Sequence, residues 1–255
     1  MTRTEKTAVP TLQRGLEILE YLGNHSTGLT IAELVEQLGY PSASVFRITQ
    51  ELTTMGYLVR EPASRRFTLT NKFLLLGRPG GEERGLVEAS LGAMRRLHKE
   101  TGETVQLCCL LETQSVILEQ LISTHPFKYS GQLGARCPAF SCAPGKAIIA
   151  ALPEDEQSDV ISRIRFKKYT PTTLSTPAAF KKELLVIREQ GFAVDRSEGL
   201  LGIHCVAAAI CDRSGLPVGA ITIAGPESRI PESEFPHLGQ LISELVARAA
   251  ANYQN

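Results

Sequence analysis

The sequence predicts an α+β protein with an N-terminal winged helix-turn-helix and a C-terminal domain built on an antiparallel sheet. Three observations lead to this fold class. Residues 12–69 contain three helical patterns and a hairpin, in the order of a winged helix-turn-helix. Proline, glycine and glutamate then interrupt regular structure at residues 78–83. Beyond them, strand patterns joined by tight turns alternate with helical patterns, which is typical of an antiparallel sheet in an α+β domain.

The first two helices are predicted from apolar spacing and end signals. Leucine and isoleucine recur at helical spacing over residues 12–22, and Gly23-Asn24 ends that helix. Thr30 opens a second, short helix as its N-cap. Glu33 follows three residues later, the spacing that a capping box requires. Gly39-Tyr40-Pro41 forms the turn that follows.

A third helix and a hairpin complete the module. The helix runs from about Ser42 to Met55, and a short turn before it suits insertion into the major groove. Residues 57–59 and 67–69 form the two strands of the wing. Arg65 and Arg66 lie at or beside its tip, where they could contact phosphates. The ordered set of three helices and a basic hairpin indicates DNA binding.

The overall composition does not favour binding to polyanions, because 27 basic residues balance 27 acidic ones. Residues 1–78 hold nine Lys/Arg and seven Glu, so the N-terminal module is weakly basic. DNA binding needs only such a local footprint. The chain lacks a run of about 18 apolar residues and a hydrophobic leader, so we expect no membrane partner and a cytoplasmic location.

The six cysteines are expected to be reduced, mostly buried thiols, because no secretion signal accompanies them. No Cys-x-x-Cys pair occurs, so the sequence favours no metal site. We expect no cofactor either.

The C-terminal domain is expected to follow a linker and a helix that runs to Glu100. Leu86, Val87, Leu91, Met94 and Leu97 form an apolar stripe on this helix that is longer than one domain face needs, which predicts a dimer contact. Further patterns predict strands and helices. The strands are expected at residues 105–111, 115–122, 192–195, 203–210 and 218–224, and the helices at 145–152, 177–191 and 232–253.

Several segments match a known family in order and spacing. They lie at residues 12–19, 33–34, 44–47, 56–59, 101–105, 145–147, 169–174, 188–195 and 202–207. On these segments the chain resembles an IclR-type bacterial transcription regulator over nearly its full length. The resemblance implies a linker helix used in dimerisation, a GAF-like effector-binding domain, and a homodimer or dimer of dimers on a palindromic operator.

The expected organisation is therefore a disordered tail at residues 1–9, a winged helix-turn-helix at 10–77, a linker and dimerisation helix at 78–100, and an effector-binding domain at 101–255. The residues expected to contact double-stranded DNA come from the first helix, the third helix and the wing. They are Arg14, Ser42, Ser44, Phe46, Arg47, Arg65 and Arg66. The family often carries a basic residue at the start of the third helix and a histidine before Arg47. This chain has neither, so its operator sequence cannot be taken from relatives.

The effector site also follows from the resemblance. Members that bind small oxo-acids use backbone amides before the Gly-Lys-Ala segment, then Asp, Cys and two hydroxyl residues. The matching positions are Ala143, Pro144, Asp195, Cys205, Thr222 and Ala224. Pro144 has no N–H and Ala224 has no hydroxyl, and each lost hydrogen bond to a charged ligand costs about 1.5–3 kcal/mol. We therefore expect a carboxylate or polyhydroxy effector larger than a two- or three-carbon oxo-acid, unless Arg136 or Lys146 replaces the lost donors.

Enzymatic functions find little support in the residues, and we expect no catalytic residue. Gly145-Lys146 lacks the other positions of a Walker A loop. His204 and Cys205 are adjacent on a strand and point to opposite faces, so they cannot act as base and nucleophile. Asp195 and Glu198 are expected to be solvated.

The leading prediction is a ligand-responsive transcriptional regulator, more often a repressor, of a catabolic operon. The alternative is a small-molecule-binding or interaction protein whose winged helix does not read DNA.

Overall fold

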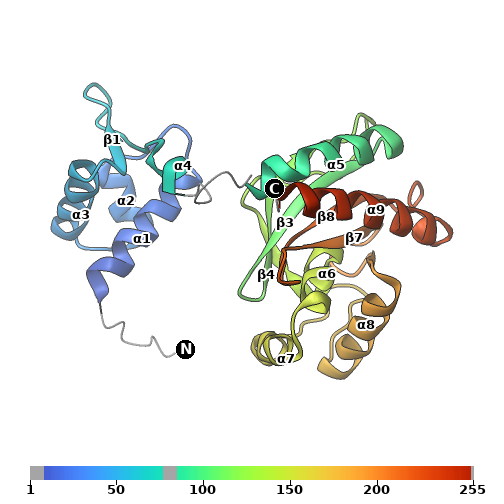
Figure 1. Ribbon diagram of the computed structural model, residues 1–255. Coiled ribbons are helices and arrows are strands. Elements are labelled where there is room, and N and C mark those ends of the chain that lie inside the picture. The colour runs from blue at the N-terminus through green and yellow to red at the C-terminus, as the bar shows by residue number, and fades with distance from the viewer. Residues whose placement is uncertain (1–8, 77–84, 254–255) are drawn as a thin grey trace. The chain divides into compact units, whose positions relative to one another are not determined.

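The computed structural model describes residues 9–76 and 85–253. The chain divides into two compact units, residues 1–78 and 79–255, and each is described by itself. Figure 1 shows the elements of both. Most of the predicted tail at residues 1–9 and the predicted linker at 78–83 lie outside the described residues.

The first unit is the predicted winged helix-turn-helix. Its elements are α1 (Pro10–Gly23), α2 (Ile31–Leu38), α3 (Ser42–Thr54), the hairpin β1 (Leu58–Arg60) and β2 (Phe67–Leu69), and α4 (Lys72–Leu76). Ile18, Leu34, Val45, Leu58 and Phe67 form its core, one or more from each of the first five elements. The capping box is confirmed, since the Thr30 hydroxyl accepts from the Glu33 N–H and the Glu33 carboxylate accepts from the Thr30 N–H.

The wing is tied to the loop between α1 and α2. Leu29 and Phe67 exchange two backbone hydrogen bonds, N to O at 3.1 and 2.8 Å. Gly28 has a φ of +70°, and a Cβ there would lie 2.6 Å from the Phe67 carbonyl oxygen. Only glycine allows this approach at low cost, so the base of the wing has a defined position.

The second unit is built on a six-stranded antiparallel sheet with the order β5-β4-β3-β8-β7-β6. Its strands are β3 (Thr104–Leu111), β4 (Gln114–Leu121), β5 (Arg136–Pro138), β6 (Ala193–Arg196), β7 (Ile203–Cys211) and β8 (Pro217–Pro226). The predicted antiparallel sheet is confirmed. β5, a strand of three residues at the sheet edge, was too short for the sequence pattern to indicate.

Helices cover both faces of this sheet. One face carries α5 (Leu86–Thr101) and α9 (Phe235–Tyr253), which lie side by side in Figure 1; the 3-10 turn η2 (Glu232–Glu234) precedes α9. The other face carries η1 (Ala139–Ser141), α6 (Ala143–Ala151), α7 (Glu154–Arg163) and α8 (Pro177–Gln190). The sequence pattern did not indicate α7, whose first turn is acidic and which buries only Val160 and Ile161. No helix in the described ranges is long and apolar enough to cross a membrane.

The apolar stripe of α5 packs inside its own unit. Met94 and Leu97 are fully buried against the sheet and α9, and Leu86 and Val87 pack against the same cluster. Leu91, the remaining residue of the stripe, is half-buried and outside this cluster, so the predicted dimer contact stays a prediction. Because α5 is part of the core of the second unit, a dimer contact must use its exposed side or other elements.

Side chains of β7 alternate between two different environments. Val206, Ala208 and Ile210 face α5 and α9, whereas Cys205 and Ala207 face α6. Alternation follows from the two-residue period of a strand. The α6 face has small residues, and this leaves space between sheet and helices.

Candidate functional site

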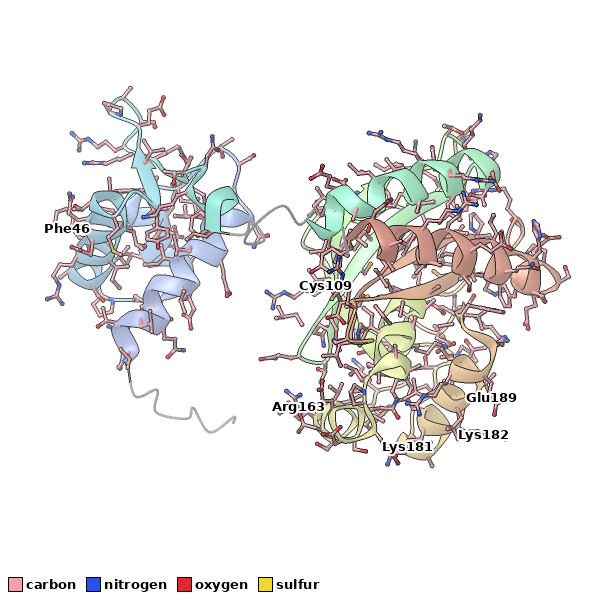
Figure 2. The ribbon with its side chains drawn as sticks, viewed as in Figure 1. Phe46, Cys109, Arg163, Lys181, Lys182 and Glu189 are labelled. Atoms are coloured by element: carbon pink, nitrogen blue, oxygen red, sulfur yellow. The ribbon has the colours of Figure 1, made fainter. Side chains whose placement is uncertain are left out.

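The first candidate surface is the exposed side of α3. Ser42 and Arg47 are exposed, and Phe46 is 52% exposed. Figure 2 shows Phe46 pointing away from the body of the domain. No described side chain caps the start of α3, and the Ser44 and Val45 amides both donate to the Pro41 carbonyl. The amides that remain at the start of a helix, here those before Ser44, can receive a phosphate, so α3 presents a surface suited to DNA.

Arg14 and Ser44 form a contact between α1 and α3. The Arg14 Nη1 donates to the Ser44 hydroxyl at 3.2 Å, and its guanidinium lies 5.2 Å from the centre of the Tyr40 ring. Both side chains are half-buried. The structure thus brings together two of the predicted DNA residues beside the start of α3.

The two wing arginines differ in their surroundings. Arg65 is exposed in the turn after β1, with a φ of +58°. Arg66 turns back onto the domain: its guanidinium donates to the Gly28 carbonyl at 2.7 Å and to the Glu33 carboxylate at 2.8 Å. Arg65 is therefore free of the body of the domain on its exposed side, whereas Arg66 joins the wing to the start of α2.

The second candidate site is a cavity of about 180 Å³ between the sheet and α6. Residues from all six strands of the sheet, η1, the start of α6 and three loops line it. They are Gln106, Cys108, Ile117, Tyr129, Cys137, Pro138, Ser141, Cys142, Pro144, Tyr169, Asp195, Gly199, Leu200, Ile203, Cys205 and Thr222. The exposed side chains of Tyr169 and Leu200 mark its mouth.

Four of the six predicted effector residues line this cavity: Pro144, Asp195, Cys205 and Thr222. Asp195 on β6 lies opposite Cys205 on β7, so the antiparallel register brings their side chains to one face. The other two, Ala143 and Ala224, are buried in the adjacent apolar cluster and are not among the lining residues. The Thr222 hydroxyl donates to the Val206 carbonyl at 3.2 Å, which leaves its oxygen able to accept.

Asp195 and Glu198 are buried, and the expectation that they are solvated is wrong. Their exposed fractions are 5% and 3%. Beneath the cavity the Lys146 ammonium lies 2.5 Å from a Glu198 oxygen and 3.3 Å from a Glu183 oxygen. Burial alone would lower the pKa of Lys146, but Glu198 and Glu183 outweigh it and raise this pKa above its ordinary value. Lys146 is therefore a cation whose charge is already paired with Glu198 and Glu183 inside the fold.

Two local features hold this ion pair in place. Gly145 allows α6 to approach η1, since a Cβ there would lie 2.4 Å from the Ala139 Cα. The hydroxyls of Thr170 and Thr173 donate to the Glu198 carbonyl at 3.2 and 2.7 Å. These contacts explain what the Gly-Lys-Ala segment and the threonine-rich segment do in the structure.

Three of the thiols that line the cavity have raised pKa values. Burial raises the pKa of the Cys205 and Cys108 thiols, and contact with Cys137, followed by burial, raises that of Cys142. Within the described ranges, no three His, Cys, Asp or Glu side chains are grouped so that they could hold a metal ion. The His204 ring contacts Phe235, on the α9 side, so the predicted separation of His204 from Cys205 is confirmed.

Sequence reasoning missed several cavity residues. Gln106 pairs with Thr222 across β3 and β8, so it shares a face with the predicted site, and its polar side chain within an apolar strand was the available signal. Tyr129 comes from the loop between β4 and β5 and gave no signal. The Lys146–Glu198 contact joins residues 52 positions apart, which no local pattern indicates.

Two family models match this chain, one for each of its two units. Residues 82–251 match the family described as bacterial transcriptional regulator IclR C-terminal, and residues 11–62 match the IclR helix-turn-helix domain. The chain belongs to the IclR family. It is thus a DNA-binding transcriptional regulator with a C-terminal effector domain.

Individual relatives cover nearly the whole chain. Transcriptional repressor IclR of Escherichia coli strain K12 is 28% identical over 96% of this chain and 90% of its own length. The HTH-type transcriptional repressor AllR of the same strain is 29% identical over 91% and 86%. The fold is similar to an IclR homologue of Microbacterium hydrocarbonoxydans complexed with 4-hydroxybenzoate, with a TM-score of 0.80, 19% identity and coverage of 95% and 98%.

Proposed function

We propose that this IclR-family chain represses a catabolic operon and responds to a small metabolite bound between the sheet and α6. The observation that carries the proposal is one cavity, lined by Asp195, Cys205 and Thr222, in a chain that also presents an exposed recognition helix. The IclR and AllR relatives are named as repressors, which supports repression over activation.

The DNA site that we propose consists of α3 and the tip of the wing. Ser42, Phe46 and Arg47 would face the major groove, and Arg65 would contact the backbone or the minor groove. Ser44 and Arg14 would support the start of α3, and Arg66 would fix the wing. A homodimer, or a dimer of dimers, would place half-sites one helical turn or a multiple apart.

Fluorescence anisotropy with the upstream intergenic DNA of the chain's own gene tests the first part. We expect specific binding that weakens with salt, and light scattering should show a dimer or tetramer at micromolar concentration. A monomer that still protects a full palindrome would contradict the dimer. No preference for this DNA over a scrambled duplex would reject the proposed function.

A thermal-shift screen tests the effector part. A ligand that binds only the folded state at a hundred times its dissociation constant stabilises it by about 2.7 kcal/mol. Cys205→Phe should fill the cavity and abolish the shift, while circular dichroism confirms the fold. Larger sugar acids or aromatic acids should give the shift, because Pro144 and Ala224 supply no donors for a small oxo-acid. Tight binding of glyoxylate or pyruvate instead would reject that part of the proposal.

A further inference from the structure

The cavity is acidic and has no cation on its walls. Of the residues that line it, Asp195 is the one acid, and neither lysine nor arginine is among them. The cation directly beneath, Lys146, is already engaged by Glu198 and Glu183. Arg136, at the β5 edge, is exposed and does not line the cavity. Lys146 and Arg136, the two residues that could have replaced the lost donors, therefore do not line the cavity.

One side-chain oxygen of Asp195 remains available. Oδ1 accepts from the Glu198 N–H at 2.6 Å. Oδ2 has no hydrogen-bond partner in the part of the chain that the structure describes, and the Asp195 side chain, 5% exposed, lines the cavity. A carboxylate oxygen in a largely apolar cavity is unfavourable unless it carries a proton or meets a donor.

One cation stands against several carboxyl groups beside Asp195. Lys146 supplies one positive charge, and Glu198 and Glu183 can supply two negative ones. Burial raises the pKa of Glu198, and the charge of Lys146 opposes that rise. An ionised Asp195 would add a third negative charge, and a carboxylate ligand a fourth. Like charges at such short range cannot all remain ionised in a buried site. A proton at Asp195 removes this conflict.

The size of the cavity limits the ligand. An apolar protein cavity of about 150 Å³ accepts benzene. The present cavity measures about 180 Å³ and has apolar walls from Ile117, Pro138 and Ile203. One six-membered ring with a single polar substituent matches this space.

We propose that this cavity binds a ring-sized carboxylate effector together with one proton. The Asp195 carboxyl holds this proton, and its O–H donates a hydrogen bond to the ligand carboxylate. This inference rests on the proposed effector function of the same site. The one bond formed is the Asp195 O–H: solvent supplies the proton when Asp195 is ionised, and the O–H then donates a hydrogen bond to the ligand oxygen. The protonation state of Asp195 thus decides how well the cavity binds a charged ligand compared with an uncharged one.

The groups around Asp195 set the pH range of this coupling. Burial, followed by the charge of Glu198, raises the pKa of Asp195 to about 7. The titratable and charged groups that share the cavity with Asp195 or belong to the charge cluster beside it come from the loop after β6, from α6 and α8, from β3, β5 and β7, and from the loops at the mouth. They are Glu198, Lys146, Glu183, Cys108, Cys137, Cys142, Cys205, Tyr129 and Tyr169. Cys205, Cys142, Cys108 and Tyr129 have raised pKa values, so they stay neutral across the range in which Asp195 titrates.

Isothermal titration of the full chain with benzoate and with benzamide tests the proposal, because the two probes share a shape and differ in charge. Benzoate affinity should fall about tenfold from pH 6 to pH 8, and its binding at pH 8 should take up close to one proton. Benzamide affinity should change little. Proton uptake is measured from the binding enthalpy in two buffers with different ionisation enthalpies.

Asp195→Asn keeps the shape of the side chain and removes its titration, so benzoate binding should lose its pH dependence. Asp159→Asn, at an exposed site on α7, is the matched control and should behave as the wild type. Equal benzoate affinity at pH 6 and pH 8 without proton uptake would overturn the proposal. So would benzamide binding without benzoate binding at pH 6, or no binding of either probe at millimolar concentration. Operator binding is measured separately: its loss would reject the proposed function, whereas a pH-independent benzoate affinity rejects only this inference.

Discussion

Each unit contains an ion pair that holds a functional element, and the two pairs lie in opposite environments. In the winged unit, Arg66 and Glu33 are about one-third exposed at 34% and 37%. In the effector unit, Lys146 and Glu198 are 0% and 4% exposed. Exposed pairs contribute little to stability, whereas removing one partner of a buried pair leaves an uncompensated charge. The wing pair should therefore matter mainly for position, and the buried pair for stability.

Breaking the buried pair should give the largest effect. Lys146→Met leaves Glu198 buried without its cation, and we expect a loss of about 3–5 kcal/mol in the unfolding free energy of the effector unit. The double variant Lys146→Met/Glu198→Gln removes both charges and should recover much of this loss. Urea unfolding followed by circular dichroism measures both. A Lys146→Met variant as stable as the wild type would show that the buried pair is no more important than the exposed one.

Asp195 extends the buried charge cluster and should make its stability depend on pH. Its pKa moves from 3.8 to about 7 on folding, so the folded state binds more protons between these values. Stability must then fall as pH rises through this window and stay low above it. Asp195→Asn should be more stable than the wild type at pH 8, by at most about 4 kcal/mol, and not at pH 4. Thermal unfolding at the two pH values checks this; an equal effect at both would exclude titration of Asp195 as the cause.

The exposed pair should act on DNA binding more than on stability. Arg66→Ala removes the side-chain bonds to Gly28 and Glu33 and leaves the Leu29–Phe67 backbone bonds, so DNA must order the tip of the wing again on binding. Ordering even one residue costs enough to weaken the operator complex about five- to thirtyfold. Hydroxyl-radical footprints should lose protection beside the wing and keep it at α3, and Arg66→Lys should recover part of the affinity. Loss of protection at both places would mean that Arg66 supports the whole domain.

The winged unit could be predicted almost completely from sequence because its signals are local. The capping box of Thr30 and Glu33 spans three residues, and the wing strands lie seven residues apart. What local pattern could not show is the direction of a side chain. Arg65 and Arg66 are neighbours, yet only the fold turns Arg66 back to Glu33, 33 positions earlier.

The effector site could be predicted only in part, since distant segments form it. Asp195 and Cys205 were found through family resemblance, and their strands then place them opposite each other. Lys146 was considered as a ligand donor because nothing local showed that Glu198, 52 positions later, already engages it. The burial of Asp195 was missed because distant segments cause it. A short acidic segment is usually solvated, but here α6 and the threonine-rich segment with Thr170 and Thr173 pack beside Asp195 and Glu198.

Of these variants, Arg65→Ala should have the smallest effect. Its side chain is exposed, so Arg65→Ala should leave thermal stability unchanged. If it neutralises one phosphate, the slope of log affinity against log salt should become less steep by about 0.9. Arg66→Ala should leave this slope nearly unchanged while weakening binding at every salt concentration, and the double variant should lose one phosphate contact and not two. Anisotropy titrations at four salt concentrations decide the matter, because a double variant that loses two contacts would show that Arg66 leaves Glu33 to reach the DNA.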